Sequence, residues 1–347
     1  MTVVTAMALW SARRDGRPRA CFLDASVVGA VAVLLPFGLA DDHFRAIRLI
    51  CYGLFGFLAA TWAGCAWLLR RSHRRSAALF ALGCLAIAVV AVDGFWIEPH
   101  WLEVSRIQLV SDKLNTPVKV ALLADLQTDE IGDYERMVIE RIVAEQPDLI
   151  LLAGDYIQEW DSARHMELLV ELRDLLNRCG FSAPLGVYAV RGNVDAGDWD
   201  DAFLGTDVTI VPRSQSFSAG DLLVSCLSMR DSFSTDVTVA EDERFQIVLG
   251  HCPNFALGDV RGDLLVAGHC HGGQVQVPWF GPLVTHARVP RSWAAGVTRL
   301  SGGRTLVVSR GVGMERGAAP RLRILCRPEL IFLELLPKSE REASASR

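Results

Sequence analysis

The first 97 residues contain no lysine and only five acidic residues, against ten arginines. Residues 98–347 have the opposite balance, a net charge of −10, so they lack the basic surface that nucleic acids require. None of the nine cysteines forms a Cys-x-x-Cys pair, and no internal repeat is present. The scattered cysteines argue against a disulfide scaffold, and we expect no nucleic-acid partner.

Three long stretches near the N-terminus lack charge. The second, Leu49–Leu69, is 21 residues long, and the third runs from Ser76 to Val92 and extends to Ile97. The first, Ala25–Ala40, contains Pro36. Because about 20 apolar residues cross a bilayer as a helix, we predict a transmembrane region over 1–97, with spans at about 22–40, 49–69 and 76–97. The alternative is three buried helices of a soluble domain.

Arginines mark the orientation of these spans. They cluster before the first span and after the second, at Arg13, Arg14, Arg17, Arg19, Arg70, Arg71, Arg74 and Arg75. Basic residues stay cytoplasmic, so three spans place residues 98–347 on the extracytoplasmic side of the inner (cytoplasmic) membrane. The orientation inverts if the first span does not insert. No cleavable signal peptide is predicted.

Beyond the spans, residues 98–117 read as a juxtamembrane connection and 118–337 as one α/β domain. Strands expected at Val118–Ala124, Leu149–Ala153 and Val187–Val190 alternate with amphipathic helices at Tyr134–Glu145 and Ala163–Asn177. After residue 195 the pattern is mostly β, with strands expected at Leu222–Ser228, Phe245–Leu249, Leu264–Ala267, Val275–Val277, Thr305–Val308 and Leu330–Leu335. An α/β sandwich is the fold class that this order favours. The polar tail 338–347 is predicted to be disordered.

Polar side chains follow most of these strands. They are Asp125, Gln127, Asp155, Asn193, His251, His269 and His271. Strand ends on one rim of an α/β sheet commonly form a site, and this mixture of oxygen and nitrogen donors suits Mn²⁺, Fe²⁺ or Zn²⁺. One aspartate can bridge two such ions, and two neighbouring ions suit phosphoryl transfer to water.

Gly272-Gly273-Gln274, Ser309-Arg310-Gly311-Val312-Gly313 and Pro320-Arg321 resemble the membrane-associated bacterial branch of the calcineurin-like metallophosphoesterases. Five short motifs also fall in the order of that family's motifs. They are Asp125-Leu126-Gln127, Gly154-Asp155, Gly192-Asn193-Val194-Asp195, Gly250-His251 and Gly268-His269-Cys270-His271. The resemblance implies a four-layer αββα sandwich over about 118–336. The branch includes enzymes that cleave the pyrophosphate of UDP-diacylglucosamine.

The resemblance also implies a role for each site residue. Asp125, Gln127, Asp155 and His271 would hold one metal ion. Asp155, Asn193, His251 and His269 would hold the second, with Asp155 as the bridge that positions the attacking hydroxide. Asp195 would orient a ligand or the Asn193 turn, and Arg191 and Arg310 are candidates for phosphate contacts.

Two positions depart from the family pattern. Gln127 stands where a histidine is usual, which predicts a weaker first site or one shifted toward Mn²⁺ or Mg²⁺. Val194 stands where many members have a histidine that protonates the leaving group, which predicts substrates that leave unaided, such as diphosphates. With both altered, a catalytically weak metal- or phosphate-binding signalling module is the alternative function.

The sequence therefore predicts a membrane-anchored, metal-dependent phosphoesterase. It would hydrolyse a phosphate ester or diphosphate by attack of metal-activated hydroxide on phosphorus. A membrane anchor concentrates lipid-borne substrates, so a lipid-linked phosphate is expected, whereas extracytoplasmic placement argues against a UDP-sugar, which is cytoplasmic. A soluble-type hydrolase with merely hydrophobic N-terminal helices is a third possibility.

Overall fold

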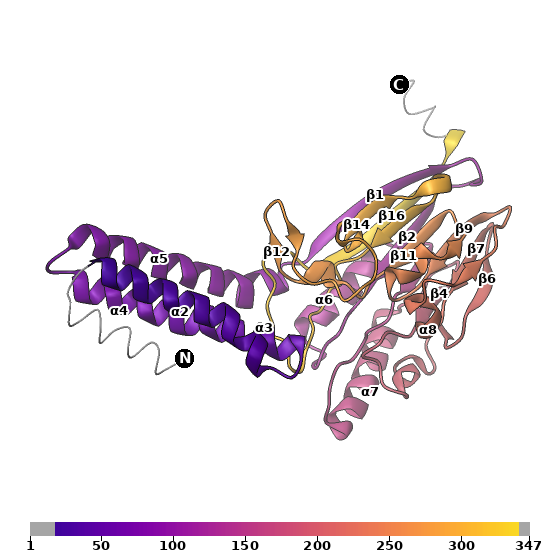
Figure 1. Ribbon diagram of the computed structural model, residues 1–347. Helices are drawn as coiled ribbons and strands as arrows, with labels where there is room; N and C mark the ends of the chain where they lie inside the picture. Colours follow the sequence, from indigo (N-terminus) through magenta and orange to yellow (C-terminus); the bar gives the residue numbers. More distant parts are fainter. Residues whose placement is uncertain (1–17, 340–347) are drawn as a thin grey trace. The chain divides into compact units, whose positions relative to one another are not determined.

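The computed structural model describes residues 18–339, which form two units (Figure 1). The first contains the chain up to Ile97 together with Gly317–Arg321, and the second contains Glu98–Arg316 and the chain from Leu322 onward. Part of the N-terminal arginine cluster and most of the expected disordered tail lie outside the described residues. Each unit is described by itself below.

The first unit is helical. Its elements are α2 (Pro18–Leu39), α3 (His43–Cys51), η1 (Tyr52–Leu58), α4 (Ala59–Leu69), α5 (Arg74–Val92) and η2 (Asp93–Ile97). They build three apolar helices that are long enough to cross a membrane, Pro18–Leu39, His43–Leu69 and Arg74–His100. Only 28, 17 and 11% of their most apolar windows is buried, so they are not the buried core of a soluble domain. The prediction of three apolar N-terminal helices is confirmed.

Small residues let these helices approach closely. A Cβ atom added to Gly53 would lie 2.5 Å from the Cβ of Ala32, and one added to Gly83 would lie 1.6 Å from the ring of Trp62. Glycine at a helix contact is typical of helices that pack in a bilayer, where van der Waals contact replaces the hydrophobic effect as the driving force.

The second unit contains two six-stranded mixed sheets. The first has the order β1 (Glu103–Ser111), β16 (Glu329–Pro337), β2 (Val118–Leu123), β3 (Leu149–Leu152), β4 (Val187–Val190), β5 (Val208–Val211). The second has the order β14 (Gly296–Arg299), β15 (Thr305–Val308), β11 (Leu264–Ala267), β9 (Phe245–Leu249), β7 (Leu222–Cys226), β6 (Gln215–Ala219). The strands β2 to β5 run parallel to one another, as do β7, β9, β11 and β15. Parallel neighbours end at the same rim, which is what a strand-end site requires.

The core lies between these two sheets and on their outer faces. Leu122 and Leu151 of the first sheet and Ile247 and Val266 of the second share one buried cluster. Helices α6 (Asp133–Ala144) and α7 (Ser162–Cys179) bury the outer face of the first sheet. The outer face of the second packs against short elements that include η5 (Pro253–Leu257), with Phe255 fully buried. The structure confirms the predicted α/β sandwich.

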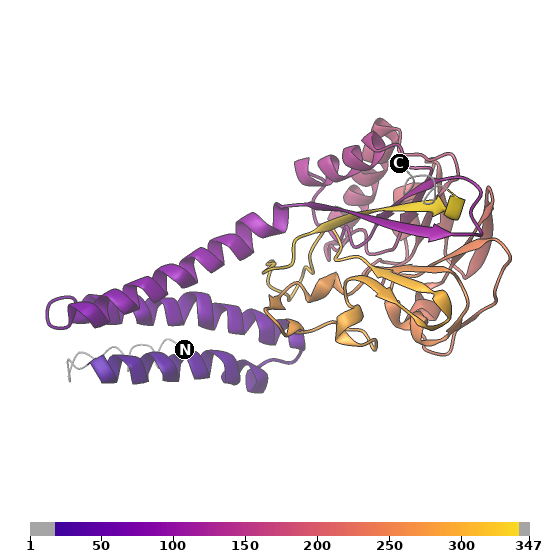
Figure 2. The same cartoon turned by 90° about the horizontal axis from the view of Figure 1, so that it is seen from above.

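Residues 98–117 and 275–277 are two of the places where the elements differ from the sequence prediction. The expected connection at 98–117 contains β1, which pairs in parallel with β16 over nine residues, and the two strands lie side by side in Figures 1 and 2. Leu109 is the one buried residue of β1. The strand therefore lacks the alternation of buried and exposed residues that reveals a half-buried strand. The expected strand at Val275–Val277 is confined to β12 (Gln276–Val277), which forms a hairpin outside both sheets with β13 (Gly281–Pro282).

A buried arginine fixes the loop that follows β15. The guanidinium of Arg323 is fully buried and donates to the carbonyl oxygens of residues 310, 311 and 313 and of Cys326, at 2.6–3.2 Å. The same loop bonds back to the end of β2, where the Gly313 amide donates to the Asp125 carbonyl at 2.7 Å. Arg323 thereby holds the loop against the strand that carries a candidate metal ligand.

Replacing Arg323 with methionine should destabilise the second unit. The variant leaves four buried carbonyl oxygens short of their charged donor, and we expect the free energy of unfolding to fall by about 3 kcal/mol or more. Arg261→Met is the matched control, because Arg261 is exposed and should change stability by less than about 0.5 kcal/mol. Chemical denaturation of the full chain in detergent measures both, and equal stabilities would contradict the role of Arg323.

Candidate metal centre

The seven candidate ligands come from the carboxyl-terminal ends of strands in both sheets. Asp125, Asp155 and Asn193 follow β2, β3 and β4 of the first sheet, and His251 and His269 follow β9 and β11 of the second. Gln127 and His271 each lie two residues beyond a neighbouring ligand. The loops are tied together, because the Asp125 amide donates to the Gly154 carbonyl and the Gly268 amide to the His251 carbonyl.

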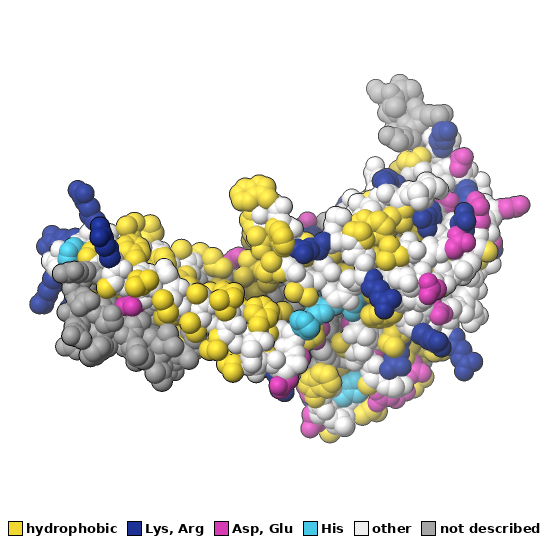
Figure 3. Space-filling model, viewed as in Figure 1, with side chains coloured by type: hydrophobic (Ala, Val, Ile, Leu, Met, Phe, Trp, Pro, Cys, Tyr) yellow, Lys and Arg dark blue, Asp and Glu magenta, His cyan; other side chains and the backbone are white. Residues whose placement is uncertain are grey.

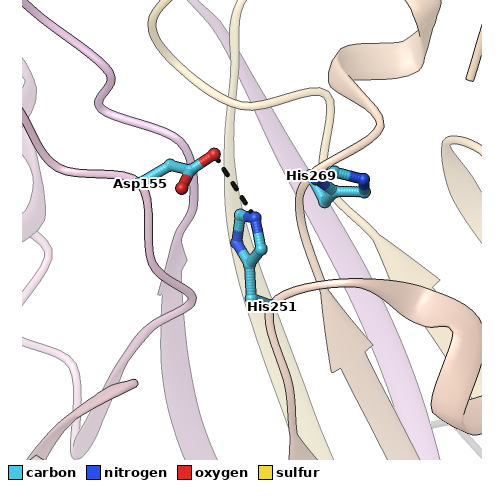
Figure 4. A group of neighbouring side chains, drawn as sticks. All are labelled: Asp155, His251 and His269. Carbon is cyan, nitrogen blue, oxygen red and sulfur yellow. Dashed lines mark ion pairs between the residues drawn. The ribbon is translucent and has the colours of Figure 1, made fainter. Parts of the chain in front are cut away.

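Two groups of side chains converge there, and they share one carboxylate. Asp155, His251 and His269 each offer a ligand atom within 4.8 Å of the others, and Asp125, Asp155 and His271 do the same. Figure 4 shows the first group, in which Asp155 and His251 face one another. Asp155 is common to both groups, and the assignment of the seven residues to two metal ions stays a prediction.

The backbone at this site is strained. Asp125, Gln127, Asp155, His269 and His271 all have positive φ angles, between 35° and 67°. Residues with a Cβ seldom adopt this conformation, which costs about 1–2 kcal/mol each, and such strain concentrates at functional sites. The sequence did not reveal this feature, because none of these positions is glycine.

Hydrogen bonds from backbone amides fix the turn that carries Asp155, and most of them are accepted by Asp195. Asp195 accepts hydrogen bonds from the amides of Asp155, Tyr156 and Gly192 at 2.7–2.9 Å, and so fixes the turn that carries Asp155. The Val194 amide donates to Oδ1 of Asp155 at 2.9 Å. A Cβ on Gly192 would lie 2.0 Å from that same oxygen, so only glycine fits there. Asp195 therefore positions the Asp155 turn.

His251 presents one ring nitrogen to the centre. Its Nδ1 donates to the Ala153 carbonyl at 2.7 Å, which fixes the tautomer and leaves Nε2 facing Asn193 Oδ1 at 2.9 Å and Asp155 Oδ2 at 3.3 Å. Burial lowers the pKa of His251, but the charge of Asp155 outweighs it and raises this pKa to about 9. The negative field that favours a proton at this nitrogen also favours a cation.

The other two histidines are held neutral. Burial, followed by the charge of His251, lowers the pKa of His269 to about 4, and burial places the pKa of His271 well below its usual value. Nε2 of His269 lies 3.2 Å from the His286 carbonyl, which leaves Nδ1 on the opposite side of the ring. Neutral imidazole is the form that binds metals.

The two buried aspartates, Asp125 and Asp155, influence each other's pKa. Burial raises the pKa of Asp125, the charge of His251 opposes this rise and the nearby Asp155 adds to it, so that the pKa is raised to about 7. Burial also raises the pKa of Asp155, but the charge of His251 outweighs it and the pKa lies below its usual value. Two buried carboxylates next to each other favour a polyvalent cation.

Gln127 turns its carbonyl oxygen away from its hydrogen-bond partners. Its Nε2 donates to Gln158 Oε1 at 3.0 Å and to Glu315 Oε2 at 2.9 Å, and because a carboxylate only accepts, this orients the amide. Its Oε1 is buried and has no partner among the described residues. Sequence reasoning missed Gln158 and Glu315, which lie outside the strand-end pattern and whose amide and carboxylate also bond to each other.

These orphaned atoms fit divalent metal ions. Both ring nitrogens of His271, like Oε1 of Gln127, are buried without a hydrogen-bond partner in residues 18–339. In the neutral imidazole one of these nitrogens is an acceptor and the other a donor, so two buried acceptors lack a partner, which is costly, and a cation would satisfy both acceptors. The donor set of carboxylate, amide and neutral imidazole is the one expected for Mn²⁺, Fe²⁺ or Zn²⁺.

The two arginines expected at the phosphate are already held by protein groups. Arg191 donates to the Asp195 carbonyl from Nε and Nη2, and Arg310 pairs with Glu103 and Glu329 at 3.2 and 3.1 Å. The structure thus gives each guanidinium a place in the scaffold. Val194 contributes only its backbone amide to the site, because its side chain has no polar atom.

Residues 118–277 match the family model of the calcineurin-like phosphoesterases. An uncharacterized metallophosphoesterase of Bacillus subtilis, YkuE, is 27% identical over 77% of this chain and 99% of its own length. The phosphodiesterase YaeI of Escherichia coli is 29% identical, over 74% and 97%. The UDP-2,3-diacylglucosamine pyrophosphatase LpxG of Chlamydia muridarum is 21% identical, over 70% and 93%.

The matched segment contains β2, β3, β4, β9 and β11, the five strands whose ends carry the candidate ligands. Its sandwich of two sheets places those ends together. Family model and relatives therefore agree that the chain contains a calcineurin-like phosphoesterase domain and is a hydrolase of phosphoester bonds.

Proposed function

We propose that the chain is a membrane-anchored, metal-dependent phosphoesterase that cleaves a phosphodiester or diphosphate. The observation that supports this most directly is the pair of ligand groups that share Asp155. We assign Asp125, Gln127, Asp155 and His271 to one metal ion, and Asp155, Asn193, His251 and His269 to the other. When bound, two divalent ions supply an activated water and neutralise phosphate charge.

The protein's own residues prepare this chemistry. Asp155 lies between both groups, and Asp195 and the Val194 amide keep its carboxylate in place. The Ala153 carbonyl holds His251 in the tautomer that presents Nε2. These supports fix the ligands before substrate arrives, which is how a protein keeps the cost of reorganisation low during the reaction.

The leaving group is expected to depart without a proton from position 194. Valine has no proton to donate, and the side chain of this residue cannot act as a general acid. Diphosphates and activated diesters have leaving groups that depart without receiving a proton, whereas aliphatic alkoxides do not depart in this way. We propose a lipid-linked phosphate as substrate, because the chain carries apolar helices and because one relative is named as a UDP-2,3-diacylglucosamine pyrophosphatase.

The proposal extends to the domain boundaries and to the side of the membrane on which the catalytic domain lies. We propose a transmembrane region over 1–97 and a catalytic domain that reaches to residue 337 and includes β1. We also propose that three spans place this domain outside the cytoplasm, on the basis of the arginine clusters around Arg19 and Arg70. That placement favours an envelope lipid over a cytoplasmic nucleotide sugar.

The purified full chain should hydrolyse bis-nitrophenyl phosphate in the presence of Mn²⁺. It should cleave this diester and diphosphates faster than phosphomonoesters of aliphatic alcohols, because Val194 cannot protonate a poor leaving group. Asp155→Asn should lower the rate by more than about 100-fold, since residues that only support ligands are already worth 10–100-fold. Initial rates with each substrate measure this.

Asp207→Asn is the matched control, because Asp207 is exposed, and its rate should equal that of the unaltered chain. Faster cleavage of aliphatic monoesters would contradict the leaving-group argument. Metal binding without any hydrolysis would instead support the catalytically weak signalling module.

Gln127 should set the metal preference of the first site. Its amide oxygen is a harder, neutral donor than imidazole, so the unaltered chain should retain Mn²⁺ better than Zn²⁺ there, and Gln127→His should reverse the order. Metal analysis after dialysis measures the stoichiometry, with Gln127→Leu as the variant that lacks the donor and should lose one ion. Two tightly held Zn²⁺ per unaltered chain would overturn this prediction.

A reporter fused after the C-terminus should lie outside the cytoplasm. Alkaline phosphatase, which is active only there, should give a signal, and green fluorescent protein should not. Deletion of the first apolar helix should exchange the two signals, because the number of spans becomes even. The reverse pattern in the unaltered chain would refute the proposed side, and release of the chain by carbonate would refute the anchor.

A further inference from the structure

The hairpin of β12 and β13 exposes a group of large apolar side chains. Trp279 is fully exposed, Phe280 is 57% and Leu283 52% exposed, and Val277 is also on the surface. Figure 1 shows the hairpin projecting from its domain, and Figure 3 shows hydrophobic side chains gathered over it. An apolar tip of this kind indicates a surface that another apolar phase covers.

The hairpin is rigidly attached to the loop that carries the metal ligands. It begins five residues after His271, and the side chain of Gln276 donates to the Gly272 carbonyl at 2.6 Å. The Gln276 amide donates to the Ile324 carbonyl at 2.9 Å. At the tip, Trp279 has a φ of +65°, a strained conformation that turns the chain sharply. The tip is thus presented by a defined structure.

Chain connectivity places this hairpin on the side of the domain from which the apolar helices leave. Ile324, which bonds to the hairpin base, is followed by Leu325, whose amide donates to the carboxylate of Glu98 at 2.8 Å. Glu98 directly follows Ile97, where the first unit ends. Trp279 is three residues beyond Gln276, within about 10 Å of it along a strand. The base of the hairpin is therefore linked through Ile324 and Leu325 to Glu98, the residue at which this domain joins the apolar helices.

The charge of this segment suits a lipid surface. Between Leu264 and Met314 there is no aspartate or glutamate and there are five arginines, in a part of the chain whose net charge is −10. The guanidinium of Arg291 lies 4.4 Å from the centre of the Phe280 ring. Exposed aromatic rings beside arginine are typical of the interface between lipid headgroups and acyl chains, where anionic lipids attract the basic groups.

We propose that the β12–β13 hairpin inserts into the interface of the bilayer that the apolar helices cross. The insertion would hold the metal centre at the headgroup level, so that a lipid-borne phosphate reaches it without leaving the membrane. The proposal rests on the proposed membrane anchoring, and it does not depend on catalysis. It accounts for a fully exposed tryptophan in the segment that follows His271.

Lipid contact at position 279 can be measured directly in the full chain. A Trp279→Cys variant is labelled with an environment-sensitive NBD probe and reconstituted into vesicles of phosphatidylcholine and phosphatidylglycerol that contain nitroxide-labelled lipids. The natural cysteines are buried or half-buried, and the unaltered chain gives the background labelling. Leu204→Cys is the matched control, because Leu204 is similarly apolar and exposed but precedes β5, at the opposite edge of the sheet from β1.

The probe at 279 should shift to shorter wavelength and be quenched by the nitroxide lipids, and the probe at 204 should not. Equal quenching at the two positions would overturn the proposal. So would a shift at 279 that requires a high ratio of protein to lipid and no quenching, since this outcome would assign the hairpin to contact between copies of the chain.

A second variant separates this proposal from the proposed function. Trp279→Glu combined with Phe280→Glu should slow hydrolysis of a lipid-linked nitrophenyl phosphodiester in the same vesicles by about tenfold, because charge at the tip opposes insertion. The rate with water-soluble bis-nitrophenyl phosphate should stay the same. Equal loss on both substrates would contradict the proposal, whereas an unaltered chain that cleaves neither substrate while its 279 probe is quenched would refute only the proposed function.

Discussion

One buried carboxylate organises this protein. Asp155 belongs to both groups of ligand side chains, and it is buried where an unbalanced negative charge would be costly. The sandwich of two sheets brings histidines of the second sheet to the aspartates of the first, and Asp195 and Gly192 fit closely around the Asp155 turn. The positive φ angles at five ligand positions fit the same requirement, because the donors must converge on a small volume.

The need for ligand atoms to converge around Asp155 also applies to the two positions that depart from the family pattern, Gln127 and Val194. At Gln127 the amide group is fixed by Gln158 and Glu315, so its oxygen is presented as firmly as a histidine nitrogen would be. At Val194 the backbone amide supports Asp155, while the side chain removes a proton donor from the centre. We propose that the first change adjusts which ion is preferred, and that the second restricts the substrates to those with good leaving groups.

Much of this site could be predicted from the sequence, because strand-end motifs such as Gly268-His269-Cys270-His271 mark both the fold and its rim. The sequence could not show that Gln158 and Glu315 orient Gln127, since the bond from Gln127 to Glu315 joins residues 188 positions apart. The strand β1 escaped notice because it is an edge strand with little alternation of buried residues. Arg310, expected at the phosphate, pairs with Glu103 of that same strand.

The central claim is that two divalent ions bind to either side of Asp155. Anomalous scattering from crystals of the full chain grown with Mn²⁺, collected at the manganese edge, tests this most directly. The account predicts two peaks, one beside His251 and His269 and the other beside Asp125 and His271, with the Asp155 carboxylate between them. A single peak, or peaks away from these side chains, would contradict it.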